Sequence, residues 1–294
     1  MSGGWRRMHG VNATSNPTGT SPRDLPRRAR ARRRIGLTLV VLAAALVALQ
    51  TWRMLGGPGE AKAPVPGVPL RLHPPSGPSR AVTVVFLSSD AGWLGINKNL
   101  PRALAEQGYP TVAWNSLRYY LRERSPESAA ADLSRVLDEA ARRYGSRRFA
   151  LVGYSWGAGV LPFLVNRLPE EQRQDVVAAV YLAYPGFGAF RFRPSAWWLQ
   201  VDGSERPAER EVARLGLLPS LCIAGEQDPI RDCRSLAPHG VPHRLFPVGH
   251  SLTGLTAELL PWVQATIERG AAERGTDLGG AATPGRPDAR PGMR

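Results

Sequence analysis

A serine, an aspartate and a histidine occur in this chain with the types and order needed to attack a carbonyl group. Ser155 is the central residue of a G-x-S-x-G pattern in "LVGYSWGAG", residues 151–159. Such a serine is a nucleophile only when a base takes its proton and an acid orients that base. Because the chain has 31 glycines in 294 residues, the pattern also arises by chance, and its surroundings must decide.

The base is expected at His250, in "FPVGHSLTG", a glycine-flanked loop between a predicted strand and the last predicted helix. The acid is expected in "LCIAGEQDPIRDC", where Asp228 follows by three residues the glycine that ends a strand. Glu226 and Asp232 are the local alternatives. The predicted catalytic set is therefore Ser155, Asp228 and His250.

The negative charge that develops on an attacked carbonyl oxygen needs backbone N–H donors. Trp156, the residue after the serine, is the first predicted donor. The second is expected from "SSDAGW", the loop after an early apolar strand, at Ser89 or Asp90. An ordinary strand-to-helix turn is the alternative interpretation of this loop.

Short apolar and β-branched runs alternate with helical patterns through the body of the chain. Strands are predicted at about 81–87, 111–114, 149–152, 176–182, 221–224 and 244–246, and helices at about 98–107, 126–144, 252–268 and from 158 onward. This alternation indicates an α/β fold with a mostly parallel sheet and helices on both faces. Sites in such sheets form at the carboxyl ends of strands. Ser155 follows such an end, and the order Ser, Asp, His is that of a compact α/β-hydrolase.

The N-terminal region is basic and then apolar. Residues 1–34 carry nine arginines and one aspartate, a net +8 of the chain's +14. Nucleic-acid binding by this arm is the less favoured interpretation, because residues 35–54 form an apolar stretch long enough for a transmembrane helix. The positive-inside rule places the arm in the cytoplasm and the body outside. A signal peptide cleaved after Ala61-Lys62-Ala63, or a twin-arginine signal at Arg32–Arg34, is the alternative.

The remaining boundaries follow from composition. Residues 55–79 are rich in Pro and Gly and are predicted as a linker, residues 80–270 as the hydrolase domain, and residues 271–294 as a disordered tail. Cys222 and Cys233 bracket the acid loop, and a disulfide is expected outside the cytoplasm. Two buried free thiols are the alternative. No metal site and no cofactor are predicted, since the two cysteines lack ligand partners in zinc spacing.

An insertion between the strands at 176–182 and 221–224 is rich in aromatic residues and arginine. Such a composition is typical of a cap that contacts a bilayer surface. Packing of the same aromatic rings over the sheet is the alternative. The aromatic residues are Phe187, Phe190, Phe192, Trp197 and Trp198.

Four further stretches resemble one family. "SSDAGW", "NSLRYY…RSPESAAADL", "GYSWGAGVLPFLVNRLP" and "CIAGEQDPIRDC" are together similar to the bacterial virulence proteins VirJ and AcvB, over about residues 80–268. The resemblance implies a compact α/β-hydrolase domain, secreted or membrane-associated, with Ser155, Asp228 and His250 in the catalytic roles. It also implies hydrolysis of aminoacyl esters of phosphatidylglycerol, such as lysyl-phosphatidylglycerol, and a link to type IV secretion.

The chain departs from that family in its first loop, which usually reads S-G-D-G-G-W, and at Asn115, where an aspartate is common. The β-carbons of Ser89 and Ala91 limit how closely the backbone approaches a ligand. A cationic aminoacyl group favours a carboxylate, expected at Asp90, and a lipid phosphate favours Arg118.

Trp93 is the third residue predicted to contact substrate. The expected partner is thus a membrane phospholipid and not a nucleic acid. Hydrolysis of another ester or thioester, and a non-enzymatic secretion or envelope interaction protein on a hydrolase scaffold, are the other candidate functions.

Overall fold

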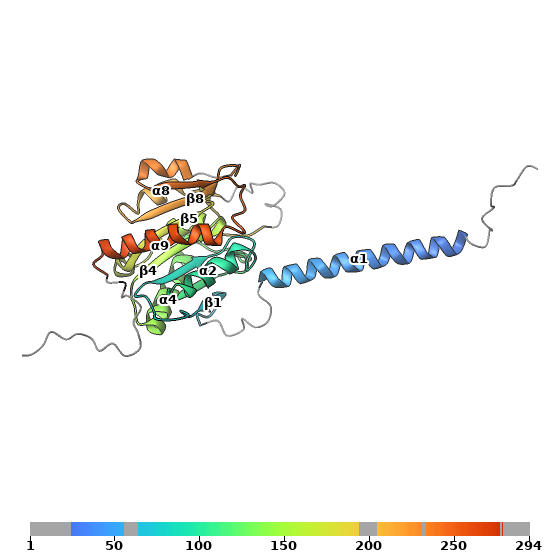
Figure 1. Ribbon diagram of the computed structural model, residues 1–294, viewed down its shortest axis with the longest axis horizontal. Coiled ribbons are helices and arrows are strands. Elements are labelled where there is room, and N and C mark those ends of the chain that lie inside the picture. Colours follow the sequence, from blue (N-terminus) through green and yellow to red (C-terminus); the bar gives the residue numbers. More distant parts are fainter. Residues whose placement is uncertain (1–24, 56–63, 194–204, 231–232, 277, 279–294) are drawn as a thin grey trace, which may run out of the picture. The chain divides into compact units, whose positions relative to one another are not determined.

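The computed structural model describes residues 25–55, 64–193, 205–230, 233–276 and 278 (Figure 1). The chain divides into two compact units at residue 50, and each is considered by itself. The second unit contains the sheet and all the predicted site residues.

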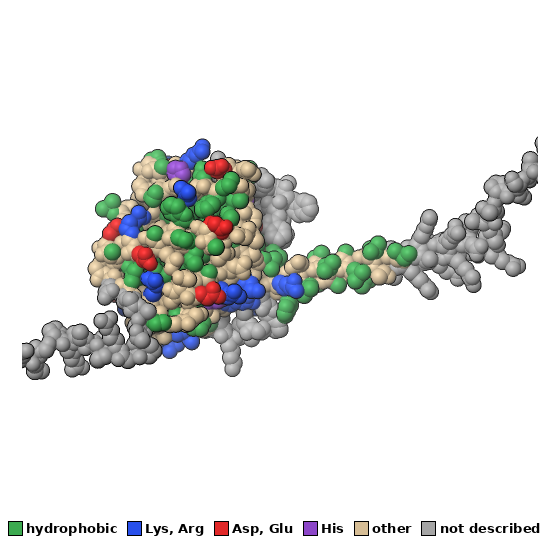
Figure 2. Space-filling model, in the orientation of Figure 1, with side chains coloured by type: hydrophobic (Ala, Val, Ile, Leu, Met, Phe, Trp, Pro, Cys, Tyr) green, Lys and Arg blue, Asp and Glu red, His purple; other side chains and the backbone are tan. Residues whose placement is uncertain are grey.

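Helix α1 (Leu25–Leu55) includes the apolar stretch expected to span a membrane. No residue of its 18-residue segment Thr38–Leu55 is fully buried, and apolar side chains lie along its surface (Figure 2). Val40, Leu46 and Val47 are each more than 60% exposed. Among the described residues, this is one helix long and apolar enough to cross a membrane, and a signal sequence has the same character.

The second unit is built on a seven-stranded sheet in which β1 is antiparallel to its neighbour and every other pair is parallel. Its order is β1-β3-β2-β4-β5-β8-β9. The strands are β1 (Leu70–His73), β2 (Thr83–Leu87), β3 (Thr111–Trp114), β4 (Phe149–Tyr154), β5 (Val176–Leu182), β8 (Ser220–Gly225) and β9 (His243–Phe246).

Helices cover both faces of this sheet, which confirms the predicted fold class. Helices α2 (Ile96–Glu106) and α9 (Thr256–Glu273) lie together over one face (Figure 1), where Leu100 and Val263 join one hydrophobic core. Helices α4 (Pro126–Tyr144) and α5 (Trp156–Val165) lie over the other and join a second core. Because both faces are covered, β2 and β5 are buried along their whole length, which is why they read as continuous apolar runs.

Helix α4 shows how local sequence sets an element's limits. Ser125 caps its N-terminus by accepting a hydrogen bond from the Ser128 N–H at 3.0 Å, and Pro126 occupies the first helical position. Gly145 ends the helix in the left-handed conformation, at φ 73°. This helix, which follows β3 in the chain, places β4 beside β2.

Two predicted boundaries are corrected. The linker expected at 55–79 is shorter, because Leu70–His73 forms β1 and pairs with β3, and Val65 and Val68 are buried beside it. A four-residue strand after Pro and Gly residues carries too little periodicity to be recognised without its partner. At the other end, α9 continues to Glu273, and Ala271 is buried in the core, so residues 271–273 belong to the domain and not to the predicted tail.

Several short elements lie outside the predicted set. The insertion between β5 and β8 contains a two-stranded antiparallel sheet and a short helix, and further short helices follow β3, α5 and β8. They are β6 (Phe187–Gly188), β7 (Arg206–Pro207), α8 (Glu209–Ala213), α3 (Ser116–Tyr120), α6 (Glu170–Asp175) and the 3₁₀ helix η2 (Cys233–His239).

Candidate active site

Ser155 stands on a sharp turn between the last residue of β4 and the first residue of α5. Its backbone has φ 48° and ψ −109°, in the region that favours glycine, and its N–H donates to the carbonyl of Leu182 at 2.7 Å. A non-glycine residue keeps such a conformation only where its surroundings enforce it. The turn separates Ser155 from the regular elements on both sides, as a strand-turn-helix nucleophile requires.

The two glycines of the motif are required by packing. A β-carbon at Gly153 would lie 2.6 Å from the backbone of Ala158, in the first turn of α5. A β-carbon at Gly157 would collide with the carbonyl of Leu87, at the end of β2. The start of α5 therefore lies directly against the end of β2, and only glycine permits that approach. This contact brings the loop that follows β2 beside the serine.

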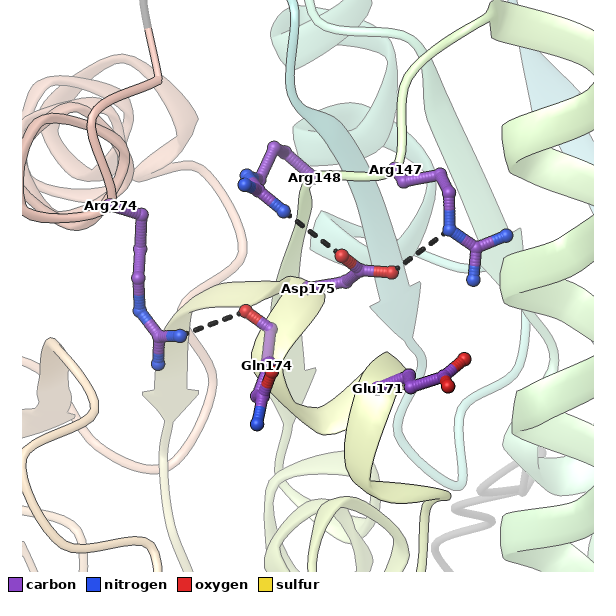
Figure 3. A pocket seen from close by; sticks show the side chains of 6 residues that line it. All are labelled: Arg147, Arg148, Glu171, Gln174, Asp175 and Arg274. Carbon is purple, nitrogen blue, oxygen red and sulfur yellow. Dashed lines mark hydrogen bonds and ion pairs between the residues drawn. The ribbon is translucent and has the colours of Figure 1, made fainter.

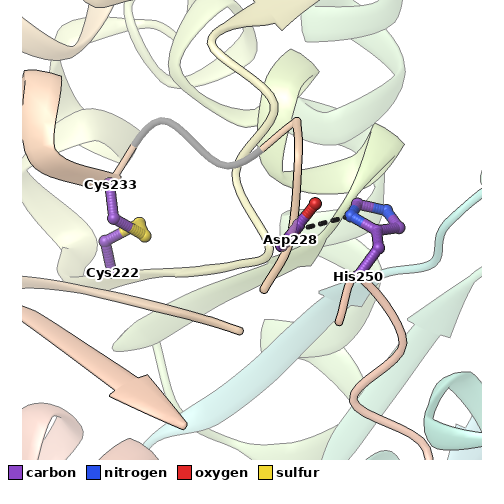
Figure 4. The surroundings of a disulfide bond; sticks show 4 residues. All are labelled: Cys222, Asp228, Cys233 and His250. Carbon is purple, nitrogen blue, oxygen red and sulfur yellow. Dashed lines mark hydrogen bonds and ion pairs between the residues drawn. A yellow bond between two sulfur atoms is a disulfide. The ribbon is translucent and has the colours of Figure 1, made fainter. Parts of the chain in front are cut away.

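The structure brings the three predicted catalytic side chains together. Ser155 Oγ lies 2.8 Å from His250 Nε2. His250 Nδ1 lies 2.7 Å from Asp228 Oδ2, the contact drawn as a dashed line in Figure 4. The Asp228 side chain is fully buried, whereas the imidazole is one-third exposed. An ionised carboxylate only accepts hydrogen bonds, so Nδ1 carries the hydrogen at that contact and Nε2 is turned to the serine. This is the arrangement of a nucleophile, a base and an orienting acid.

Backbone hydrogen bonds join the acid loop to the histidine loop. The N–H of Glu226 donates to Phe246 at 2.7 Å, and the N–H of Gln227 donates to Val248 at 3.0 Å. The second carboxylate oxygen of Asp228 accepts the N–H of Ile230 at 3.0 Å. Glu226, one alternative for the acid, is exposed on this loop, and Asp232, the other, lies outside the described residues.

A disulfide closes the acid loop. Cys222 on β8 is bonded to Cys233 at the start of η2, with a Cα–Cα distance of 5.5 Å, and both residues are buried (Figure 4). The pairing expected from the sequence is thus present. The bridge joins the strand before Asp228 to the helix after it, so it limits the motion of the loop that carries the carboxylate.

The backbone N–H groups of the expected oxyanion donors differ in whether they already have a hydrogen-bond acceptor. Trp156 is the first residue of α5, and N–H groups in the first turn of a helix have no acceptor within it. The N–H of Ser89, by contrast, donates to Asn97 Oδ1 at 2.8 Å, and both residues are buried. Ser89 is therefore committed to holding the loop, a correction to its predicted role, and Asp90 remains as the candidate second donor.

Asn97 was not expected at the site. Its Nδ2 also donates to Ser89 Oγ at 3.0 Å, so this residue of α2 fixes the loop by two hydrogen bonds. In the sequence, Asn97 is one asparagine in the first turn of an amphipathic helix, and nothing about its type marks it as a site residue.

The three residues expected to contact substrate occupy different environments. Trp93 is buried in the core, with the Arg71 guanidinium 4.6 Å from its ring centre, and its contact with substrate stays a prediction. Asp90 is partly exposed, and its charge contributes to raising the pKa of Tyr154, the neighbour of Ser155. Arg118 is exposed on α3, and its role stays a prediction.

The aromatic residues described in the insertion pack inward. Phe190 makes an edge contact with Tyr120 at 5.9 Å between ring centres, and Phe192 lies 5.9 Å from Trp156. The N–H of Phe192 donates to the carbonyl of Tyr120 at 2.6 Å. Both phenylalanines are buried, so these residues cover α3 and the start of α5 and do not form a bilayer-facing surface. Phe187 is partly buried, and Trp197 and Trp198 lie outside the described residues.

A pocket of about 430 Å³ lies at the opposite end of the sheet (Figure 3). Arg147 and Arg148, just before β4, both form ion pairs with Asp175, just before β5, at 3.1 and 2.9 Å. Arg274, after α9, donates to the carbonyl of Gln174 at 2.9 Å. These pairs join the amino ends of two strands to the C-terminal helix, which is a structural role remote from Ser155.

A model of the family described as bacterial virulence protein (VirJ) matches residues 81–267, which is 187 of the 294 residues. The chain belongs to the VirJ family. The resemblance inferred from the four sequence stretches is thereby confirmed for VirJ. A comparison with curated proteins gives no match.

Solved structures show how far the VirJ domain resembles other folds. DcsB, in complex with its substrate analogue, is 12% identical with a TM-score of 0.52, covering 70% of this chain and 95% of its own. Est1E from Butyrivibrio proteoclasticus is 12% identical with a TM-score of 0.50 and the same coverage. TT1662 from Thermus thermophilus is 22% identical with a TM-score of 0.47, covering 69% and 94%. Together with the parallel sheet and the helices on both of its faces, the similarity to DcsB and Est1E shows that the VirJ domain has the α/β-hydrolase fold.

Proposed function

We propose that this VirJ-family protein is a serine esterase outside the cytoplasm that hydrolyses an aminoacyl ester of phosphatidylglycerol, such as lysyl-phosphatidylglycerol. The observation that carries the proposal is the hydrogen-bonded series from Ser155 through His250 to the buried Asp228, with distances of 2.8 and 2.7 Å. The strained backbone of Ser155, at a helix N-terminus, adds support, because neither the strand before it nor the helix after it requires that conformation.

In the first half of the reaction, His250 Nε2 takes the hydroxyl proton while Ser155 Oγ attacks the ester carbonyl carbon. The carbonyl oxygen becomes an oxyanion, and the N–H groups of Trp156 and Asp90 are its proposed donors. His250 then gives its proton to the departing glycerol oxygen of the lipid. The aminoacyl group stays bonded to Ser155 as an ester, and Asp228 stabilises the imidazolium throughout.

In the second half, water replaces the lipid alcohol. His250 takes a proton from the water as it attacks the aminoacyl-serine ester, then returns that proton to Ser155 Oγ as the bond breaks. The products are the free amino acid and phosphatidylglycerol, and the three side chains end in their starting protonation states. No metal or redox step is needed for this balance.

The lipid substrate is supported by three features. An apolar helix precedes the domain, and an anchored enzyme stays beside a membrane lipid. The disulfide suits an oxidising compartment, as an extracytoplasmic domain would occupy. Asp90, near the serine, is the proposed partner of a cationic aminoacyl group, and Arg118 is the proposed partner of the lipid phosphate. The family resemblance points to the same substrate class.

The test uses the full chain in detergent micelles, with Ser155→Ala as the matched control. A fluorophosphonate probe should label the native chain and not the variant, and lysyl- and alanyl-phosphatidylglycerol should release free amino acid only with the native chain. Labelling without release of amino acid from either lipid would overturn the proposed substrate but support the assignment as a serine esterase. No labelling would overturn both.

A further inference from the structure

Tyr154, the last residue of β4, directly precedes the nucleophile and has no role in the sequence predictions. The residue is only 6% exposed, although its side chain carries a polar hydroxyl. The hydroxyl donates to the carbonyl oxygen of His250 at 3.3 Å and accepts the N–H of Leu252 at 3.4 Å. Its ring lies nearly parallel to the imidazole, at an interplanar angle of 20° and 6.3 Å between centres.

The position of β9 explains why these contacts matter. In the sheet, β5 and β8 stand between β4 and β9, the strand that leads to His250. Neighbouring strands lie about 4.8 Å apart, so the histidine loop must cross about 14 Å to reach Ser155. Its near end is tied to the acid loop through Phe246 and Val248. At its far end, Tyr154 bonds the backbone on both sides of Ser251.

We propose that Tyr154 is a positioning residue that holds the His250 backbone so that Nε2 stays in contact with Ser155 Oγ. The inference rests on the proposed function, since it assigns Tyr154 to the same reaction. Tyr154 acts through His250 and does not itself contact the substrate. Because it adjoins the nucleophile in the chain and bonds the base through its side chain, it fixes one relative to the other.

The hydroxyl keeps its hydrogen across the working pH range. Burial is the main cause that raises the pKa of Tyr154, and the charges of Asp90 and Asp228 raise it further. The N–H of Leu252 opposes this effect by favouring the phenolate. The donor to the His250 carbonyl is therefore retained under the conditions in which His250 acts as a base.

Packing alone is the competing interpretation, and Tyr154→Phe separates the two because it keeps the ring and removes only the hydroxyl. Tyr109→Phe is the matched control, since Tyr109 is also buried and its hydroxyl also makes a 3.3 Å hydrogen bond, to Glu268, away from the catalytic side chains. Turnover of an activated aryl ester by the full chain in detergent is measured for both variants, with unfolding temperature as a second readout.

Tyr154→Phe should lower kcat about tenfold, as expected for the loss of modest hydrogen bonds, with KM unchanged, while Tyr109→Phe should leave both constants unchanged. In a His250→Ala background, Tyr154→Phe should have no further effect on residual turnover, because its route to the reaction is gone. Equal kcat for Tyr154→Phe and the native chain, or the same tenfold loss without His250, would overturn the inference. A native chain with neither ester turnover nor fluorophosphonate labelling would overturn the proposed function instead.

Discussion

Asp228 Oδ2 lies 2.7 Å from Nδ1 of His250, with the carboxylate fully buried and the imidazole one-third exposed. The contact fixes both the direction of the ring and the nitrogen that carries hydrogen. It also sets the base at the surface, within reach of a substrate, while the acid remains inside. The two residues belong to loops that are joined by their own backbone hydrogen bonds.

Replacement Asp228→Asn should therefore lower kcat about 10⁴-fold while the chain stays folded, because the amide favours the wrong imidazole tautomer. Glu226→Gln, on the exposed part of the same loop, is the control and should keep full turnover. Ester hydrolysis and circular dichroism of both variants provide the measurement. Full turnover by Asp228→Asn would remove this carboxylate from the site.

Removal of the disulfide should act on stability and on turnover together. Replacing both Cys222 and Cys233 by alanine releases a loop of about 11 residues and should lower the free energy of unfolding by about 3 kcal/mol in the chain-entropy model. Turnover should fall as well, because the loop carries Asp228. Urea unfolding and ester hydrolysis measure the two effects, and an unchanged unfolding midpoint would contradict the first.

Gly157→Ala should damage both the fold and the site, because the new β-carbon would collide with the carbonyl of Leu87 and drive α5 away from β2. We expect a loss of about 2 kcal/mol or more in stability, in the range for overpacking of a close contact. Gly77→Ala is the control, since a β-carbon there meets no atom within 4 Å. Thermal unfolding compares them, and equal unfolding temperatures would show that the backbone gives way freely.

The stability of the domain should fall as the pH drops below about 6.5, in part through His73. Burial, followed by the charges of Arg71 and Arg102, lowers the pKa of His73 below its usual 6.5. The unfolded chain then binds a proton more readily than the folded one, so the stabilisation present above pH 6.5 is lost as the pH falls through the lowered pKa.

His73→Gln should reduce the difference between the unfolding free energies measured at pH 7.5 and 5.5. The exposed His243 on β9 offers the control, and His243→Gln should leave that difference as it is in the native chain. The same pH dependence in all three proteins would show that His73 contributes nothing to it.

The discrimination between lysyl and alanyl esters should depend on Asp90. Asp90→Asn keeps the backbone N–H and the size of the side chain but removes its charge. The ratio of kcat/KM for the lysyl over the alanyl ester should fall about tenfold, equivalent to about 1.4 kcal/mol, with turnover of the alanyl ester maintained. An unchanged ratio would mean that Asp90 is not the selector.

The sequence alone was enough to predict the three residues Ser155, Asp228 and His250, which the structure brings together, and six strands of the sheet. Ser155, Asp228 and His250 each follow a strand, and parallel strands bring their carboxyl ends to one edge, so local patterns and one topological rule are enough. The four-residue strand β1 was missed because an edge strand is defined by its partner, here β3, which lies about 40 residues further along the chain.

The directions of side chains within loops could not be predicted from the sequence. Ser89, Asp90 and Trp93 share one loop, yet one donates into Asn97, one is partly exposed and one is buried in the core. The sequence alone does not distinguish the roles of these three side chains. Their different environments follow from the packing of α2 against the loop. Tyr154 was missed for a similar reason, since its partner arrives on a loop that crosses two intervening strands.

The backbone conformation of Ser155 has a cost in the stability of the domain. A non-glycine residue at φ 48° costs of order 1–3 kcal/mol, and glycine at that position would remove the cost without disturbing the turn. The strained serine thus lowers the stability of the turn and places a reactive hydroxyl there. Gly153 and Gly157 allow the close packing that the turn needs.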